Sequence, residues 1–320
     1  MAETGNNPKH FCGIINRIPD EVIQTIVDKL SLVDAVRIGS ISRRWKDLWK
    51  YISIIKFGPE WASSTGKDII PSLNQFISQH RGQKIKEFCV EVTYKPEMSS
   101  FVDSWILFAI GKHVEELHID FSVNDGDPCH QLVPHVFNCK SLTSLRLTFC
   151  DLKLPASIQL QSLKEVHFHR IELPENAILT LTSRTPVLKY LFLSDCNRTK
   201  DLCIHVSPDC CLTLLVISDS SSVFNQGTRM VLNAPSVPNL TFDGYLLRSE
   251  YQIENITECS SVRFLGDVMF EACREVGLDI PFNDYQSLKF ENLLQQLLLG
   301  CQKADSVHLS NLYIQVPILL

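Results

Sequence analysis

One spacing pattern recurs along most of the chain and constrains its fold more than any other feature. The template is L-x-x-L-x-L, in which other apolar residues replace some of the leucines. Nine copies occur between residues 85 and 309, with apolar positions Ile85, Phe88, Val90; Val114, Leu117, Ile119; Leu142, Leu145, Leu147; Leu163, Val166, Phe168; Leu188, Leu191, Leu193; Leu212, Leu215, Ile217; Val237, Leu240, Phe242; Cys259, Val262, Phe264; and Ala304, Val307, Leu309. Their central positions are separated by 29, 28, 21, 25, 24, 25, 22 and 45 residues.

Seven of these eight gaps agree with the repeat length of about 20–29 residues that is typical of leucine-rich repeats. In such a unit a short strand points alternate side chains inward, and three of them fill one layer of a stacked core. The fold class that we predict is therefore α/β: a leucine-rich-repeat solenoid with a curved parallel sheet on its concave side. Turns and short helices are expected between the strands, and the long last gap leaves room for one degenerate repeat.

A compact helical unit is predicted ahead of the repeats, from Ile18 to about Tyr51. Its first helix follows from apolar residues at helical spacing in "IPDEVIQTIVDKL". Ser31 and Asp34 resemble a capping box, which starts a second helix near Leu32. The stripe of a third helix is formed by Ile41, Trp45, Leu48 and Trp49.

These helices carry more large apolar side chains than a bundle of about 35 residues can bury. The surplus favours a surface that binds another protein, because aromatic anchors dominate the binding energy of such interfaces. The alternative is that the surplus packs against the rest of the same chain.

The segment "IPDEVIQTIVDKLSLVDAVRIGSISRRWKDLWKYI" resembles the F-box, in the version found in plant F-box proteins with leucine-rich repeats. The likeness extends through repeat segments such as "LVPHVFNCKSLTSLRLTFCDLKLP" and covers most of residues 17 to 245. The carboxy-terminal FBD region of many relatives is not found in "KADSVHLSNLYIQVPILL". Gly39, at a position where the family usually has serine, is expected to weaken the second helix by about 1 kcal/mol.

The resemblance implies that the F-box docks onto the Skp-family adaptor of a cullin-based ubiquitin ligase. Trp49 is expected to pack toward the repeats instead. The resemblance implies that the residues that face the adaptor, or support its contact face, are Ile18, Pro19, Val22, Ile23, Ile26, Leu30, Val36, Ile41 and Trp45. The expected organisation is a disordered tail at 1–14, the F-box at 15–53 and the solenoid at 54–320, degenerate after about 250.

Composition excludes several classes of function. The net charge of −6 argues against nucleic acid as a partner, because that role needs an extended basic surface. No apolar run approaches the 18 or more residues of a membrane span, so no membrane partner is expected. Cysteines placed singly in apolar segments (Cys89, Cys150, Cys196), together with an amino end unlike a signal peptide, predict a reducing compartment, cytoplasmic and/or nuclear.

Residues that carry catalysis are not evident in the sequence. It contains no phosphate-binding glycine loop and no C-x-x-C motif. His167 and His169 share one strand face, but no third metal ligand accompanies them in the pattern. We therefore expect a non-catalytic adaptor subunit without metal or cofactor.

A target-binding site is predicted from the residue between the last two apolar positions of each repeat, which points away from the core. The row reads Cys89, His118, Arg146, His167, Phe192, Val216, Thr241 and Arg263. The predicted target-binding residues are the middle of this row, His118, Arg146, His167 and Phe192, together with His169 one pleat further along. They suit an acidic or phosphorylated segment with an apolar anchor. The alternative is that these are ordinary solvated strand residues.

Two functional hypotheses remain open at this stage. The leading one is a substrate-recognition adaptor subunit of an SCF-type cullin ubiquitin ligase, with the F-box on the Skp adaptor and the repeats on an unknown target protein. The alternative is a leucine-rich-repeat binding or sensing protein that does not promote ubiquitination. Binding to the adaptor separates the two.

Overall fold

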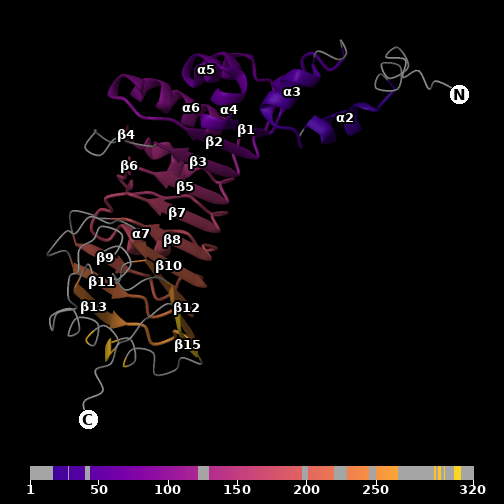
Figure 1. Cartoon of the computed structure of the whole chain (residues 1–320). Coiled ribbons are helices and arrows are strands. Elements are labelled where there is room, and N and C mark those ends of the chain that lie inside the picture. The colour runs from indigo at the N-terminus through magenta and orange to yellow at the C-terminus, as the bar shows by residue number, and fades with distance from the viewer. Residues whose placement is uncertain are drawn as a thin grey trace, which may run out of the picture. The chain divides into compact units, whose positions relative to one another are not determined.

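The computed structural model describes residues 17–27, 29–39, 44–121, 130–196, 201–219, 229–244, 250–265, 292, 295–296, 299 and 306–310. The chain divides into two compact units, Met1–Pro128 and Cys129–Leu320, and each is described by itself. Figure 1 labels the helices and strands of both.

The first unit opens with two short helices, α2 (Asp20–Val27) and α3 (Leu32–Ile38). The predicted start of α3 is confirmed, because the Ser31 hydroxyl accepts a hydrogen bond from the Asp34 backbone N–H at 3.1 Å. The same hydroxyl donates to the Asp34 carboxylate at 2.8 Å. This pair satisfies a backbone donor that a helix start leaves without an intrahelical partner.

Two local expectations in this region are wrong. Gly39 does not lie inside a helix but caps the end of α3, so the expected helix penalty does not apply. A Cβ atom at this position would lie 3.2 Å from the backbone oxygen of Lys46, which explains why a glycine fits there. The third α-helix is replaced, over the described residues, by turns from residue 44 and a 3-10 helix, η1 (Leu48–Tyr51).

The rest of the first unit is a three-stranded parallel sheet in the order β1–β2–β3, accompanied by helices. Its elements are β1 (Ile54–Phe57), α4 (Pro59–Thr65), α5 (Ile69–Gln79), β2 (Glu87–Glu91), η2 (Pro96–Met98), α6 (Ser99–Gly111) and β3 (Glu116–Asp120). Strand β1 is a copy of the template that the pattern search missed, with buried Ile52, Ile55 and Phe57. It was missed because its central position lies 33 residues before Phe88, outside the usual repeat length.

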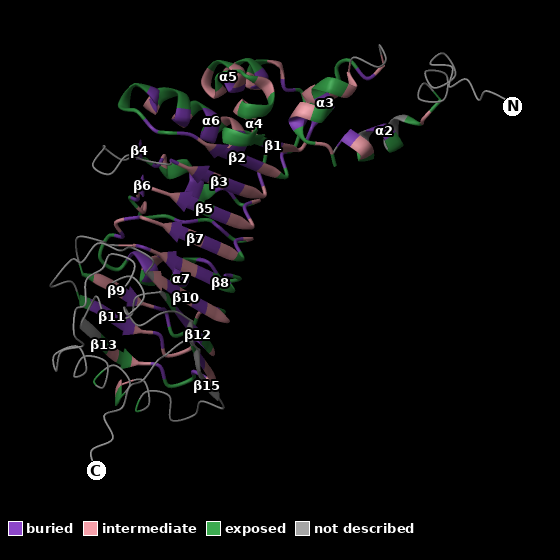
Figure 2. Cartoon of the chain, viewed as in Figure 1, coloured by how far each residue is buried: buried purple, intermediate pink, exposed green. Residues whose placement is uncertain are grey.

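The second unit continues the repeat with seven parallel strands in the order β5–β7–β8–β10–β12–β14–β15. They are β5 (Ser144–Thr148), β7 (Glu165–His169), β8 (Tyr190–Ser194), β10 (Leu214–Asp219), β12 (Asn239–Gly244), β14 (Ser261–Leu265) and β15 (Ser306–Ser310). Buried positions recur at the template spacing from β5 to β12 (Figure 2). The predicted α/β solenoid is confirmed, with each of the nine template copies forming a strand.

The ends of three successive strands share one backbone feature. The residue after each of β5, β7 and β8 has a left-handed conformation, with φ between 50° and 58°, although none is glycine. Each N–H donates to a backbone carbonyl at the end of the next strand, at 2.8–2.9 Å. These bonds offset the steric cost of positive φ. The residues are Phe149, Arg170 and Asp195.

A second layer of strands was not predicted. The helix α7 (Ala177–Arg184) precedes β8, in agreement with the expectation of short helices, but later connections contain strands. They form a parallel sheet in the order β13–β11–β9. Its strands are β9 (Leu202–His205), β11 (Arg229–Asn233) and β13 (Glu250–Asn255).

The remaining described elements of the second unit are short. A two-stranded parallel sheet joins β4 (His130–Gln131) to β6 (Cys150–Asp151), and the 3-10 helix η3 (Pro134–Asn138) lies between them in sequence. The degenerate repeat expected between the last two template copies falls on a segment that lies almost entirely outside the described residues. The described strands on either side of it, β14 and β15, pair with each other.

We predict that stability depends on pH through His80, which is buried at the end of α5. Its ring Nε2 donates to the backbone oxygen of Ile52 at 3.0 Å, and the ring meets Phe108 edge-on. Burial lowers the pKa of His80 below its ordinary value of 6.5, with a smaller contribution from Lys112. As the pH falls through 6.5 the unfolded chain therefore binds a proton first, and the free energy of unfolding decreases.

Urea unfolding at pH 7.5 and at lower pH measures this loss. His80→Gln should flatten the dependence in the window below pH 6.5, whereas His135→Gln, which removes an exposed histidine, should leave the wild-type slope. An unchanged slope in His80→Gln would contradict the assignment.

We also predict that Thr182 links α7 to the second layer. Its buried hydroxyl donates to the backbone oxygen of Ile178 at 2.8 Å and accepts from the Ser207 N–H at 3.0 Å. Thr182→Val leaves that buried N–H without an acceptor, so the free energy of unfolding should decrease by about 1–3 kcal/mol. Thr182→Ser keeps the hydroxyl and is the matched control. Equal urea midpoints for the valine variant and the wild type would overturn this role.

Candidate functional site

The predicted adaptor-binding residues include both exposed and buried side chains in the structure. Val22 on α2 and Val36 on α3 are 47% and 50% exposed, which is unusual for large apolar side chains, and Pro19 is exposed as well. By contrast, Ile23 is 1% and Trp45 is 3% exposed, so both belong to the core of the unit. The first group offers a contact surface and the second holds it in place.

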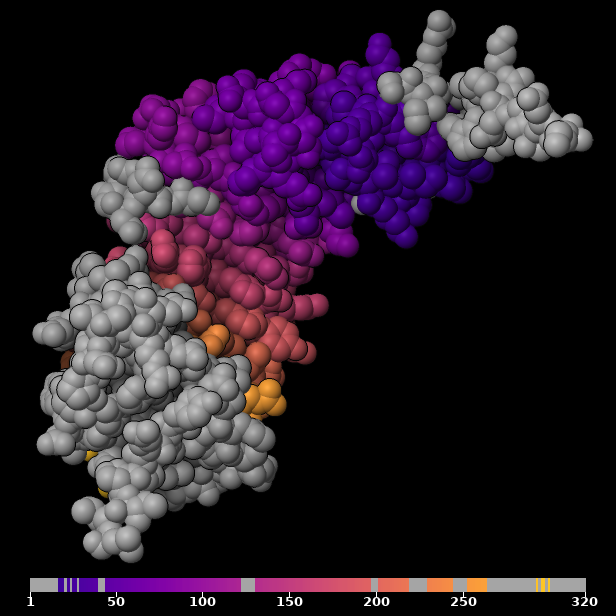
Figure 3. Space-filling view, in the orientation of Figure 1, coloured from indigo at the N-terminus to yellow at the C-terminus, as the bar shows by residue number. Residues whose placement is uncertain are grey.

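The other predicted adaptor-binding residues are either intermediate in burial or outside the described residues. Ile18, Ile26 and Leu30 are half-buried, and Ile41 lies outside the described residues. The described F-box residues appear in indigo on the face drawn in Figure 3.

Trp49 lies where the sequence places it, toward the repeats. Its ring centroid is 5.8 Å from that of Phe76 on α5. The two rings line a cavity of about 420 Å³ together with Val36 and Trp61. Val36 thus combines exposure with a position at the mouth of an apolar recess inside the first unit.

In the second unit the strand register brings the predicted outward row together. Arg146 pairs with His167, His167 with Phe192, and Phe192 with Val216. The row continues through Thr241 to Arg263. It is not uniformly solvated, since Thr241 is buried whereas Arg146 and Arg263 are exposed.

A carboxylate that the pattern did not single out joins the middle of this row. Glu165 Oε1 accepts a hydrogen bond from Arg146 Nη2 at 3.0 Å and also contacts His167 Nε2. On its other side, the His167 ring stacks on Phe192, with centroids 4.1 Å apart and planes 8° from parallel. Arg146, Glu165, His167 and Phe192 therefore form one connected group, here called the strand cluster.

The sequence contained the information needed to find Glu165. It lies two residues before His167 on β7, so alternation along the strand puts both side chains on one face. His169 follows in the same alternation at the end of β7 and is half-buried. The predicted cationic group is therefore partly neutralised by its own neighbour.

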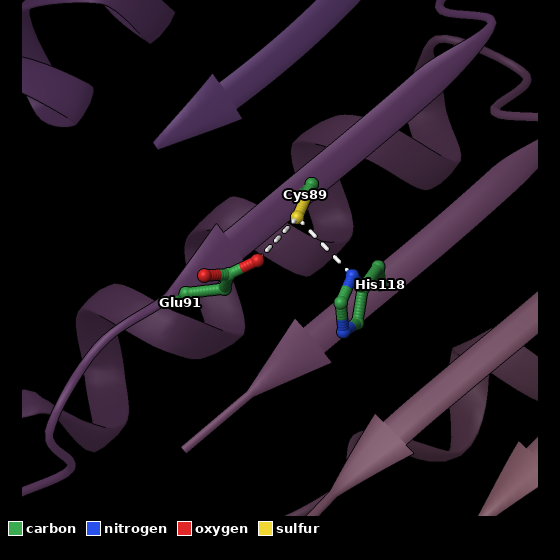
Figure 4. Close-up of side chains that lie close together, drawn as sticks. All are labelled: Cys89, Glu91 and His118. Carbon is green, nitrogen blue, oxygen red and sulfur yellow. Dashed lines mark hydrogen bonds between the residues drawn. The ribbon is translucent and has the colours of Figure 1, made fainter. Parts of the chain in front are cut away.

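His118, the remaining predicted target-binding residue, belongs to the first unit. Its Nδ1 lies 3.2 Å from Cys89 Sγ on the neighbouring strand β2. The Cys89 thiol also donates to Glu91 Oε1 at 3.6 Å (Figure 4). Burial, and then the charge of Glu91, raises the pKa of Cys89 to about 12, so the thiol stays protonated at neutral pH.

The fold and the two helices at its beginning define a class of protein: an F-box joined to leucine-rich repeats. Comparison with known families supports this reading. The family described as "FBD-associated F-box protein At5g56370, LRR repeats" matches residues 102–280, and the F-box domain matches residues 15–57. Since the first match spans more than half of the chain, the protein belongs to the plant family of F-box proteins with leucine-rich repeats.

Curated relatives from Arabidopsis thaliana agree with this membership. The F-box/FBD/LRR-repeat protein At1g51370 is 28% identical over 56% of this chain and 40% of its own length. The putative F-box/FBD/LRR-repeat protein At1g66290 is 25% identical over 94% of this chain and 64% of its length. The F-box protein At4g09920 is 27% identical over 76% of this chain and 78% of its length.

The chain thus spans less than two thirds of the length of the first two relatives. Among the residues that the structure describes, no helix has the length and apolar character needed to cross a bilayer.

Proposed function

We propose that this protein is the substrate-recognition subunit of an SCF-type cullin ubiquitin ligase. Its F-box docks a Skp-family adaptor and, through it, a cullin, while the repeats bind a target protein. The chain itself carries out no chemical step in this role. Its contribution is to raise the local concentration of the target near the ubiquitin-loaded enzyme.

The observation that carries the proposal is the F-box match at residues 15–57, whose helices expose Val22 and Val36. Exposed aliphatic side chains on helices are suited to bury apolar area against a partner, at about 25 cal/mol per Å². The residues Ile23 and Trp45 are buried and belong to the core beneath these helices. The proposed docking face therefore consists of side chains whose removal need not unfold the unit.

For the target we propose the strand cluster as the centre of recognition. Arg146 forms an ion pair with Glu165 at 3.0 Å, and an acidic or phosphorylated target group would compete with that carboxylate for the guanidinium. The stacked rings of His167 and Phe192 offer an adjacent flat surface for an apolar side chain. Such a site is selective, because a target must supply both the anion and the apolar anchor at the right separation.

We propose that the protein acts in the cytoplasm and/or the nucleus. Thiols that form no disulfide, such as those of Cys89 and Cys196, support a reducing compartment.

Docking predicts a specific loss when charge is placed on the F-box face. Val22→Glu and Val36→Glu each put a carboxylate into the proposed apolar contact, and each should weaken binding to a co-expressed Skp adaptor by about 2 kcal/mol or more. Co-purification followed by titration of the purified partners measures the change. The far-ultraviolet circular dichroism of both variants should match the wild type.

Val187→Glu is the matched control, because Val187 is 37% exposed but lies in the second unit. Wild-type adaptor binding by both F-box variants would contradict the docking face. A wild-type chain that binds no Skp adaptor would favour the other hypothesis, a leucine-rich-repeat binding or sensing protein that does not promote ubiquitination.

If the strand cluster binds the target, substitutions in it should abolish target binding without affecting adaptor binding. Arg146→Glu combined with Phe192→Ala removes both the guanidinium and the ring, so proteins that co-purify from native cells through the repeats should be lost while the adaptor is retained. Arg184→Glu with Val187→Ala is the control, since both residues are exposed and lie outside the strand cluster. Retention of the same target by the first double variant would exclude this site.

A further inference from the structure

Three potential metal ligands meet on the outward face of the sheet in the first unit. Cys89 and Glu91 alternate along β2, so their side chains leave the strand on the same side. His118 on β3 is the register partner of Cys89. Among the described residues, these three are the group whose sulfur, nitrogen and carboxylate oxygen all lie within 4.8 Å of one another (Figure 4).

The distances suit a tetrahedral ion. With Zn–S bonds near 2.3 Å and Zn–N or Zn–O bonds near 2.0–2.1 Å, neighbouring ligand atoms of a zinc site lie about 3.4–3.6 Å apart. Cys89 Sγ lies 3.2 Å from His118 Nδ1 and 3.6 Å from Glu91 Oε1. Both distances are close to those between two ligand atoms of one zinc ion, and all three ligand atoms lie within 4.8 Å of one another.

Negative charge surrounds the Cys89 sulfur. The carboxylate of Glu91 lies 3.6 Å from it, and Glu87 is on the same face of β2. The same negative surroundings attract a divalent cation, which in turn stabilises the thiolate as a ligand. Lys56, the register partner of Cys89 on β1, is held by Glu87 at 2.7 Å, and this pairing offsets its charge.

An ion can reach this position from outside the sheet. Cys89 and Glu91 line a cavity of about 580 Å³ in the first unit, together with residues at the start of α3 and on α4. His118 is half-buried on the adjoining strand. A site with three protein ligands and an open side leaves room for a water molecule as the fourth ligand, as in zinc sites that are not fully closed by protein.

We propose that Cys89, Glu91 and His118 bind one zinc ion, with water as the fourth ligand. On binding, the Cys89 thiol releases its proton to solvent and its thiolate coordinates the ion, while His118 coordinates through Nδ1 and Glu91 through its carboxylate. Thiolate, imidazole and carboxylate together form a donor set that zinc accepts. This site is independent of adaptor docking, so it stands or falls separately from the proposed function.

The test uses the purified full chain, freed of metal by a chelator and kept reduced. Zinc is titrated in competition with a chromophoric chelator, and cobalt is added separately as a spectroscopic probe. We expect one tightly bound zinc per chain, a thiolate-to-cobalt charge-transfer band, and a higher unfolding temperature with zinc. Cys89→Ser and His118→Ala should each weaken zinc binding at least about tenfold, and Cys89→Ser should abolish the cobalt band.

Cys139→Ser is the matched control, because Cys139 is as buried as Cys89 but lies in the second unit next to Ser141. It should leave affinity and spectrum unchanged. Glu91→Gln alters a half-buried side chain without changing its shape, so its zinc affinity should fall about tenfold while the metal-free unfolding temperature stays at the wild-type value. It decides the question if Cys89→Ser fails to fold. Zinc binding that is absent in the wild type, or equal in the wild type and Glu91→Gln, would overturn the proposal.

Discussion

The structure depends on the inability of any one repeat to bury its own apolar side chains. A strand such as β7 buries Val166 and Phe168, and it pairs with the neighbouring strands β5 and β8, which belong to other repeats. Each inward side chain contributes about 1.5–3 kcal/mol to the free energy of folding when it is buried. Much of the stability therefore comes from contacts between neighbouring repeats. This constraint fixes the strand register, because a shift by one residue would expose the whole inward set.

The same constraint determines how much of the fold was predictable. Inward positions must be apolar, so nine strands and the pairing of Arg146 with His167 followed from spacing alone. The layer formed by β9, β11 and β13 did not, because "CIHV" and "MVLNA" are short apolar runs between strands and equally suit buried turns. The first strand, β1, was hidden by the helices inserted between it and the next repeat.

The candidate sites were less predictable from the sequence than the fold, for a different reason. Alternation identifies which side chains face outward, but their interactions depend on neighbours that the template does not constrain. Glu165 changes the strand cluster from a cationic patch into a paired one, although its position on β7 was readable. Cys89, Glu91 and His118 come from two repeats, and only the register of β2 with β3 joins them. A search for metal motifs along the chain therefore had no spacing to detect, and the sequence alone predicted no metal.

In the F-box, the exposure of each side chain changes which of the predicted residues can be used to test docking. Both Trp45 and Val36 fit the docking pattern, yet one is enclosed and the other half exposed. Truncation of an enclosed indole costs about 3–5 kcal/mol of stability by itself, so lost adaptor binding in a Trp45 variant would report unfolding as readily as a lost contact. Val22 and Val36 separate these effects, because a charge at either exposed position is hydrated in the free chain and would lose that water in the complex. The division between enclosed and exposed residues thus sets which substitutions can test docking.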